Sequence, residues 1–95
     1  SWTVPFINDL PDDSTLDAMD SGSEINAFST DGTDVTSTIL SNRAVSAMSL
    51  TVDFNASATD GEEYTVRFEA GGATTGDVKE KIVKLVVRDD IPGGL

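Results

Sequence analysis

Apolar and polar residues alternate in three stretches of the second half of the chain. Residues 50–54 read Leu-Thr-Val-Asp-Phe, residues 64–68 read Tyr-Thr-Val-Arg-Phe, and residues 83–87 read Val-Lys-Leu-Val-Val within a longer apolar and basic run at 78–88. A period of two is that of a strand with one buried face. The pattern therefore predicts three strands in this half of the chain.

Turn residues separate these strands. Asp60-Gly61 is the strongest turn signal between the first and the second. Gly71-Gly72 and Gly76-Asp77 enclose a short loop between the second and the third. Two strands joined by a short loop that contains glycine predict an antiparallel hairpin.

The first half carries weaker signals. Its Val, Thr and Ile content, after an Asp-Gly turn, predicts a strand at 35–40, and a second short strand is expected at 24–29. Residues 2–7 also alternate, but Pro5 has no N–H for a sheet ladder, so this piece is expected to be an edge strand or an extended arm. A single helical turn with Asp13 or Ser14 as N-cap and its end before Gly22 is compatible with the segment between them.

No long helical period is present, so the chain is expected to be all-β and to form an antiparallel β-sandwich. Ninety-five residues are enough for one small domain. Residues 1–41 hold eight acidic residues and no basic one, whereas all six basic residues follow. We therefore expect an acidic N-terminal arm or edge strand at 1–23, the sandwich at 24–90, and a short Gly-rich tail at 91–95.

Composition excludes several classes of function. A formal net charge of −11 argues against nucleic acid and against anionic membrane surfaces as partners. The absence of Cys and His removes disulfides, thiol chemistry and the commonest general base. Paired carboxylates such as Asp12-Asp13 lie in polar, turn-like contexts that do not raise a pKa for acid–base work. We expect no catalytic residue, no enzyme activity and no cofactor.

Calcium is the best candidate for a small ligand, since Asp and Glu supply the oxygen ligands it prefers. Asp31-Gly32-Thr33-Asp34 and the segment 60–63 are the two acidic loops that would gather such oxygens. Neither matches the twelve-residue calcium loop with its final bidentate Glu, and ordinary turn chemistry explains both. We expect no bound metal.

Residues 60–66 read Asp-Gly-Glu-Glu-Tyr-Thr-Val. In immunoglobulin-like sandwiches a Tyr lies near the start of strand F, and its hydroxyl bonds to the backbone a few residues upstream. Tyr64, with Asp60 and Gly61 before it, resembles that structural corner. The alternative is an ordinary strand tyrosine at the rim.

The stretch 45–89 resembles the small immunoglobulin-like proteins of tailed bacteriophages, of the fibre or head decoration type. The similarity lies in Leu-Thr-Val-Asp-Phe at 50–54, Glu-Tyr-Thr-Val at 63–66, the glycine-containing loop after them, and Val-Val-Arg-Asp at 86–89. It covers about half the chain, and its motifs concern the fold. The resemblance implies an immunoglobulin-like antiparallel β-sandwich in a virion structural protein without catalysis.

Two surfaces are expected to bind partners. The first is the N-terminal arm held by a neighbouring subunit, since aromatic side chains commonly dominate interfaces; the alternative is that this segment is the first strand of the chain's own sandwich. The second is a small basic patch on the outer face of the hairpin; the alternative is a solvated strand face that protects a sheet edge. The candidate residues are Trp2, Val4, Phe6, Ile7 and Leu10 for the arm, and Arg67, Lys84 and Arg88 for the patch.

The resemblance favours a capsid decoration, or cement, protein that binds and stabilises the head lattice. Its partners would be the major capsid protein or other virion proteins, and further copies of itself. The opening has no basic-then-apolar signal segment, so we expect synthesis in the host cytoplasm and a final location on the capsid surface. The alternative is an immunoglobulin-like fibre or surface module that recognises host carbohydrate, for which Trp2 is the only plausible platform.

Overall fold

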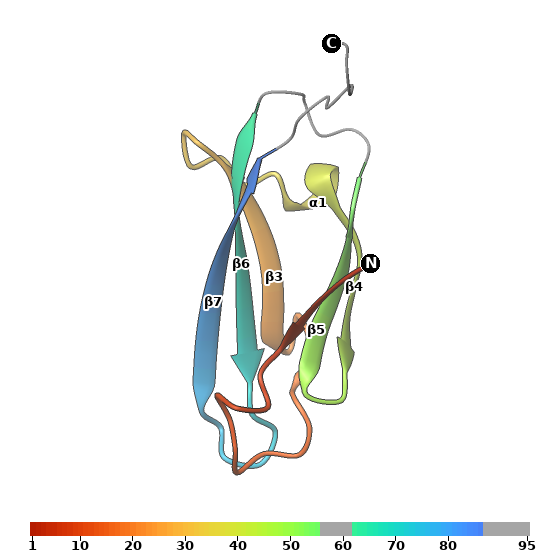
Figure 1. The fold of residues 1–95 in the computed structure, drawn as a ribbon, viewed down its shortest axis with the longest axis vertical. Coiled ribbons are helices and arrows are strands. Elements are labelled where there is room, and N and C mark those ends of the chain that lie inside the picture. Colours follow the sequence, from red (N-terminus) through yellow and green to blue (C-terminus); the bar gives the residue numbers. More distant parts are fainter. Residues whose placement is uncertain (56–61, 87–95) are drawn as a thin grey trace, which may run out of the picture.

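The computed structural model describes residues 1–55 and 62–86, and in this part of the chain it holds two β-sheets and one single-turn helix (Figure 1). The prediction of an all-β protein is confirmed. The elements are β1 (Trp2–Pro5), β2 (Ala18–Met19), β3 (Gly22–Ser29), α1 (Thr36–Ile39), β4 (Leu40–Ser46), β5 (Ser49–Phe54), β6 (Glu63–Gly71) and β7 (Val78–Val86).

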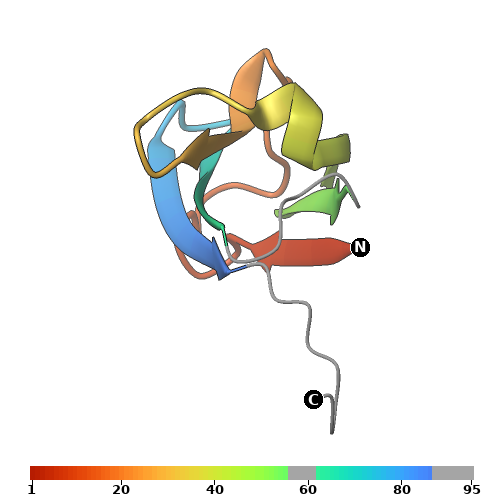
Figure 2. The ribbon, with the colours of Figure 1, turned by 90° about the horizontal axis from the view of Figure 1, so that it is seen from above.

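One sheet has the strand order β1-β5-β4 and the other the order β2-β3-β6-β7. The pairs β1–β5, β4–β5, β3–β6 and β6–β7 are antiparallel, and the short pair β2–β3 is parallel. Viewed along the strands, the two sheets lie on opposite sides of a common interior (Figure 2). The predicted hairpin is confirmed, because β6 and β7 pair over nine positions, from Glu63↔Val86 to Gly71↔Val78.

Much of the core is formed by the alternate strand positions that the pattern predicted. Leu50 and Val52 of β5 are buried, as are Val66 and Phe68 of β6. Ile25 of β3 lies opposite Phe68 and is buried with it. One face of each strand thus forms the interior, and the intervening polar residues lie at the surface.

Residues 1–23 do not extend away from the domain as an arm. β1 is an edge strand, as Pro5 allows, and it pairs with β5. Phe6 follows it, is fully buried, and donates its N–H to the Met48 carbonyl oxygen at 2.8 Å. Leu10 and Leu16 are buried as well, and the boundary expected at 23/24 falls inside β3. The segment packs on its own domain because its apolar side chains complete the core.

Residues 35–40 were expected to form a strand, and this expectation is wrong. Residues 36–39 form α1, and a strand begins only at Leu40. The hydroxyl of Thr36 accepts a hydrogen bond from the Ala27 N–H at 2.9 Å and bonds to the Asp34 carboxylate at 2.6 Å. These contacts hold the chain in one helical turn, and that turn brings Ile39 into the core.

The single helical turn considered between Asp13 and Gly22 is also absent. The structure has turns and the short strand β2 in this segment. Asp13 is buried there and binds the loop between β6 and β7. Gly72 makes this contact possible, since a Cβ on Gly72 would overlap the Asp13 carboxylate. The chain therefore passes close to the β6–β7 loop at a position where only glycine fits.

Candidate interaction surfaces

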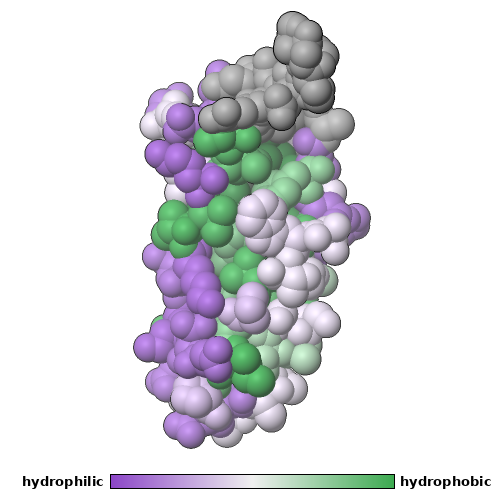
Figure 3. Space-filling view, viewed as in Figure 1, coloured by the Kyte–Doolittle hydropathy of each residue, from purple (hydrophilic) through white to green (hydrophobic). Residues whose placement is uncertain are grey.

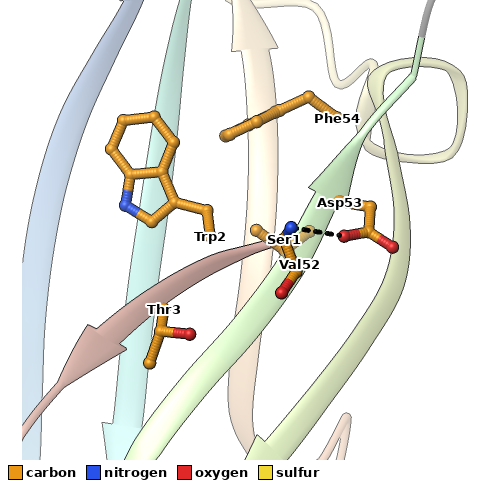
Figure 4. Close-up of a pocket in the computed structure, with 6 residues that line it drawn as sticks. All are labelled: Ser1, Trp2, Thr3, Val52, Asp53 and Phe54. Carbon is orange, nitrogen blue, oxygen red and sulfur yellow. Dashed lines mark ion pairs between the residues drawn. The ribbon is translucent and has the colours of Figure 1, made fainter.

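An open pocket lies where the start of β1 pairs with the end of β5 in the three-stranded sheet (Figure 4). It has a volume of about 660 Å³. β1 is the outermost strand of that sheet, so one side of its backbone faces β5 and the other has no neighbouring strand among the described residues. The lining residues are Ser1, Trp2, Thr3, Val52, Asp53 and Phe54.

Two aromatic rings form the apolar part of this pocket. The Trp2 and Phe54 ring centroids are 5.3 Å apart and the ring planes meet at 86°, an edge-to-face arrangement. Trp2 faces Val52 across the ladder, which places Phe54 at the diagonal position. Trp2 remains 40% exposed. This exposed aromatic ring on the outermost strand is a surface suited to binding.

Asp53 lies between Val52 and Phe54 in β5, so its carboxylate points to the opposite face of the strand from the two rings (Figure 4). Its carboxylate accepts a hydrogen bond from the Asn42 side-chain amide at 2.8 Å, and the Ser1 amino nitrogen lies 3.5 Å from its other oxygen. The Asn42 hydrogen bond is the largest cause of a lowered pKa at Asp53. The Asp53 carboxylate thus binds Asn42 and the N-terminal amino group on the side of β5 away from the rings.

The structure divides the five candidate anchors of the N-terminal segment. Trp2 and Ile7 are exposed, whereas Val4, Phe6 and Leu10 are buried in the chain's own core. The expectation that all five side chains are available to a partner is therefore wrong for the three buried ones. The second interpretation, in which Trp2, Val4 and Phe6 belong to this domain's own first strand and core, describes the structure.

The expected basic patch on the outer face of the hairpin is interleaved with acids. Arg67 Nε lies 3.5 Å from the Glu80 carboxylate, and Lys84 Nζ lies 3.3 Å from the Glu63 carboxylate. Arg88 lies outside the described residues. In the described part of the hairpin, each of these two basic residues is therefore paired with an acidic one.

The structural corner is only partly within the described residues. Tyr64 is on β6 and is buried, at the position expected of a core-facing tyrosine. Asp60 and Gly61 lie outside the described residues. The hydrogen bond of a tyrosine corner thus stays a prediction.

The acidic loop 31–34 uses its carboxylates within its own turns. Asp31 accepts hydrogen bonds from the Ser29 hydroxyl and from the Thr33 N–H, the latter at 3.0 Å, and its pKa is lowered to about 2, chiefly by the Ser29 hydroxyl. Asp34 accepts from the Thr36 N–H at 2.9 Å. Over residues 1–55 and 62–86, no three side chains of the metal-binding types lie together. Asp60, from the second acidic loop, lies outside these ranges.

Sequence reasoning missed two charged residues that join distant segments. Lys81 donates to the Pro5 carbonyl oxygen at 2.7 Å, lies 2.9 Å from the Asp9 carboxylate, and sits over the Phe6 ring at 4.8 Å. Arg43 makes a two-pronged contact with the Asp20 carboxylate at 2.9 and 2.8 Å. A signal for Lys81 was available, since it occupies a core-facing position in the alternation of β7.

Comparisons with protein-family models, with curated proteins and with solved structures find no match to this chain. Within the part of the chain that the structure describes, no helix has the length and apolar character needed to cross a membrane. The candidate surfaces therefore rest on their own geometry.

Proposed function

We propose that this protein is a non-enzymatic structural component of a bacteriophage virion, a decoration protein that binds and stabilises the capsid lattice. The observation that carries the proposal is the exposed Trp2 ring on β1, a strand with one unpaired edge among the described residues. The resemblance of residues 45–89 to small phage proteins supports the choice of partner. Such a protein would be located on the capsid surface.

We further propose that the fold is immunoglobulin-like. In immunoglobulin domains the strands lie in the order A-B-E-D in one sheet and C-F-G in the other. The order β1-β5-β4 is what B-E-D would give, with β1 as B. The order β3-β6-β7 is what C-F-G would give, with β6 as F, and the two-residue β2 beside β3 is an addition to it. In this assignment Tyr64 lies on strand F, where the tyrosine corner is found, which supports the proposal.

The same assignment suggests how a partner would bind. Strand A has no counterpart among the described residues, so the edge of β1 that A would cover is open. An extended segment of the capsid protein would add to this edge as a further strand, with backbone hydrogen bonds for affinity and the Trp2–Phe54 pocket for side-chain recognition. Pro5 would limit the added ladder to the start of β1, because it has no N–H to donate.

A small domain can act as cement through such contacts. A ligand that binds only the assembled state stabilises that state by mass action, whatever its own stability. Many copies on one lattice would multiply the effect. This explains how a marginally stable domain would serve a structural role.

The test is the binding of purified protein to capsids stripped of it, measured by co-sedimentation. We expect saturable binding, and Trp2→Ala is expected to weaken it about tenfold or more, as for an aromatic hot spot. Circular dichroism would verify that the variant remains folded. Ile7→Ala is the matched control, because it removes an exposed apolar side chain outside the pocket.

The proposal fails if the wild-type protein ignores capsids, and its assignment to the β1 edge fails if Trp2→Ala binds as well as wild type. Equal losses from Trp2→Ala and Ile7→Ala would also contradict a role specific to the pocket. Each of these outcomes can be interpreted without knowing which residues of the capsid protein make the contact.

The pocket also favours a second candidate, recognition of a host carbohydrate. A sugar stacks its apolar face on an aromatic ring while polar groups fix its hydroxyls. Trp2 supplies such a ring, and Asp53 and Thr3 line the same pocket. Because Trp2 is the single tryptophan, its fluorescence reports on the site directly. A saturable fluorescence change with neutral oligosaccharides, together with no capsid binding, would favour this candidate.

A further inference from the structure

β7 is one of the two edge strands of the four-stranded sheet, and the short β2 is the other. It pairs with β6 on one side along all nine residues, and no other described strand pairs with its second side. A long strand edge exposes unpaired backbone groups, which are a template for pairing with another chain. The edge of β7 is therefore a candidate interface.

The outward face of β7 has a symmetric pattern. Val78, Ile82 and Val86 are exposed by 57%, 55% and 41%, at every fourth residue. Glu80 and Lys84 lie between them on the same face, one on each side of Ile82. Figure 3 shows hydrophobic surface set between hydrophilic surface along the flank that β7 occupies in Figure 1. On this face, Ile82 is followed in each direction by a charged residue and then a valine. The charged residues are Glu80 on one side and Lys84 on the other, and their charges are opposite.

We propose that two copies of this chain associate edge to edge through β7, antiparallel, about a two-fold axis at Ile82. In this register Ile82 faces its own counterpart, and Val78 of each copy faces Val86 of the other. Glu80 of each copy faces Lys84 of the other. The two four-stranded sheets become one continuous sheet, and both charged positions gain an opposite partner at cross-strand distance.

The charges on β7 favour this register over the registers with the two-fold axis at a neighbouring residue. A two-fold axis perpendicular to the sheet keeps each residue on its own face, so the axis passes through a facing pair of identical residues. An axis at Glu80 sets two glutamates against each other, and an axis at Lys81 or Lys84 does the same with lysines. Within the described residues 78–86, an axis at Val83 opposes no like charges but forms no ion pair. Over the same residues, the axis at Ile82 is the one of these five that forms ion pairs.

Existing ion pairs within each chain extend the match. Glu80 already lies beside Arg67, and Lys84 beside Glu63. A row of four charged side chains then crosses the interface. It consists of Glu63 and Lys84 of one copy followed by Glu80 and Arg67 of the second copy, and the sign of the charge alternates along it. Exposed ion pairs contribute little affinity each, but they determine register.

The lysines of β7 are also compatible with this pairing. Lysine on an edge strand usually prevents edge-to-edge association. With the axis at Ile82, Lys79 faces Leu85 of the second copy and Lys81 faces Val83, so no lysine meets another. An edge contact of one strand buries little surface, so we expect a dissociation constant in the micromolar range.

The test is a charge exchange measured by sedimentation velocity over a range of protein concentrations at low salt. Glu80→Lys sets a new lysine against Lys84 twice in a homodimer, and Lys84→Glu sets a new glutamate against Glu80 twice. We expect the dissociation constant of each variant alone to be at least about tenfold higher than that of wild type. Mixed in equal amounts, the two variants restore both ion pairs, and we expect a heterodimer close to wild type in affinity.

Glu24→Lys is the matched control. It makes the same charge change on the same sheet, on β3, which is two strands in from β7. We expect it to dimerise as wild type does. Because each single variant also loses its own intrachain ion pair, only recovery in the mixture assigns the effect to the interface.

Three results would overturn the proposal: a wild-type protein that stays monomeric throughout, single variants that dimerise as wild type does, or a mixture without recovery. None of these depends on capsids or carbohydrate. Failure of the proposed function is therefore distinguishable from failure of this interface.

Discussion

Three residues other than glycine have a positive φ among the described residues, and each lies where a strand bends or turns. Asp20 has φ 62°, Asn42 φ 54° and Ala47 φ 52°. Asp and Asn tolerate this region because their short polar side chains bond locally. Ala47 has no such compensation, and it lies in the two-residue turn between β4 and β5, where Ser46 faces Ser49. The turn is therefore a local source of strain.

Ala47→Gly is expected to raise the free energy of unfolding by roughly 0.5 to 1 kcal/mol, because glycine adopts a positive φ without the steric cost that a Cβ carries. Urea denaturation followed by circular dichroism would measure the change. Ala44→Gly is the control, at an exposed position within β4. It should lower stability by about 0.5 to 1 kcal/mol. A loss of stability in both variants would contradict the strain assigned to Ala47.

At the scale of elements, the β6–β7 hairpin is positioned by a carboxylate from the N-terminal segment. Asp13 accepts hydrogen bonds from the N–H groups of Thr74 and Thr75 at 2.8 and 3.0 Å, and from the Thr75 hydroxyl at 2.7 Å. The bonds from Thr75 are the main cause of a lowered pKa at Asp13. The carboxylate thus joins two segments about sixty residues apart.

This contact predicts an acid-dependent contribution to stability. The pKa of Asp13 is lower in the folded protein than its ordinary value of 3.8, so its contribution is complete above that value and is lost as the pH falls through the folded pKa. Asp13→Asn is expected to lower the melting temperature at pH 7 by roughly 5 °C. The difference from wild type should shrink as the pH falls below 3.8.

Thermal unfolding followed by circular dichroism from pH 7 downward would measure this difference. Asp12→Asn is the control, at the exposed neighbouring carboxylate. It should leave the melting temperature close to wild type at every pH. A deficit in Asp13→Asn that stayed constant below pH 3.8 would contradict the role of the ionised carboxylate.

At the scale of the whole molecule, a single small core depends on its N-terminal segment. Phe6 is fully buried, and Lys81 of β7 lies over its ring. A chain of 95 residues has a thin margin of stability, since it buries a smaller share of its surface than a larger domain. The N-terminal segment is therefore part of the folding unit, in addition to presenting Trp2.

Phe6→Ala is expected to cost about 3 to 5 kcal/mol, the usual cost of emptying a buried phenylalanine site, and this is a large fraction of the stability of a small domain. The adjacent Ile7 is 59% exposed, so Ile7→Ala should leave stability within about 0.5 kcal/mol. Urea denaturation of the two variants would compare them directly. Full stability in Phe6→Ala would contradict the packing of this segment on its own domain.

Strand positions were predictable from sequence where one face of the strand is buried. Leu50 and Val52, like Tyr64 and Val66, occupy the core positions that the alternation predicted. This works because the side chains of a strand point to opposite faces by local backbone geometry alone. The charge asymmetry and the missing Cys and His were likewise properties of the sequence itself.

The features of the fold that the sequence did not predict depended on contacts between residues distant in the chain. The Thr36 hydroxyl accepts a hydrogen bond from the N–H of Ala27, nine residues earlier, and this contact holds residues 36–39 in a helical turn although their composition is strand-like. Phe6 and Ile7 are both apolar, and only the packing of Phe6 against distant elements separates core from surface. The symmetric pattern about Ile82 is present in the sequence, but only the position of β7 at a sheet edge makes it a candidate interface. Local periodicity determined which residues form strands, and tertiary packing alone decided which faces and edges of those strands remain open.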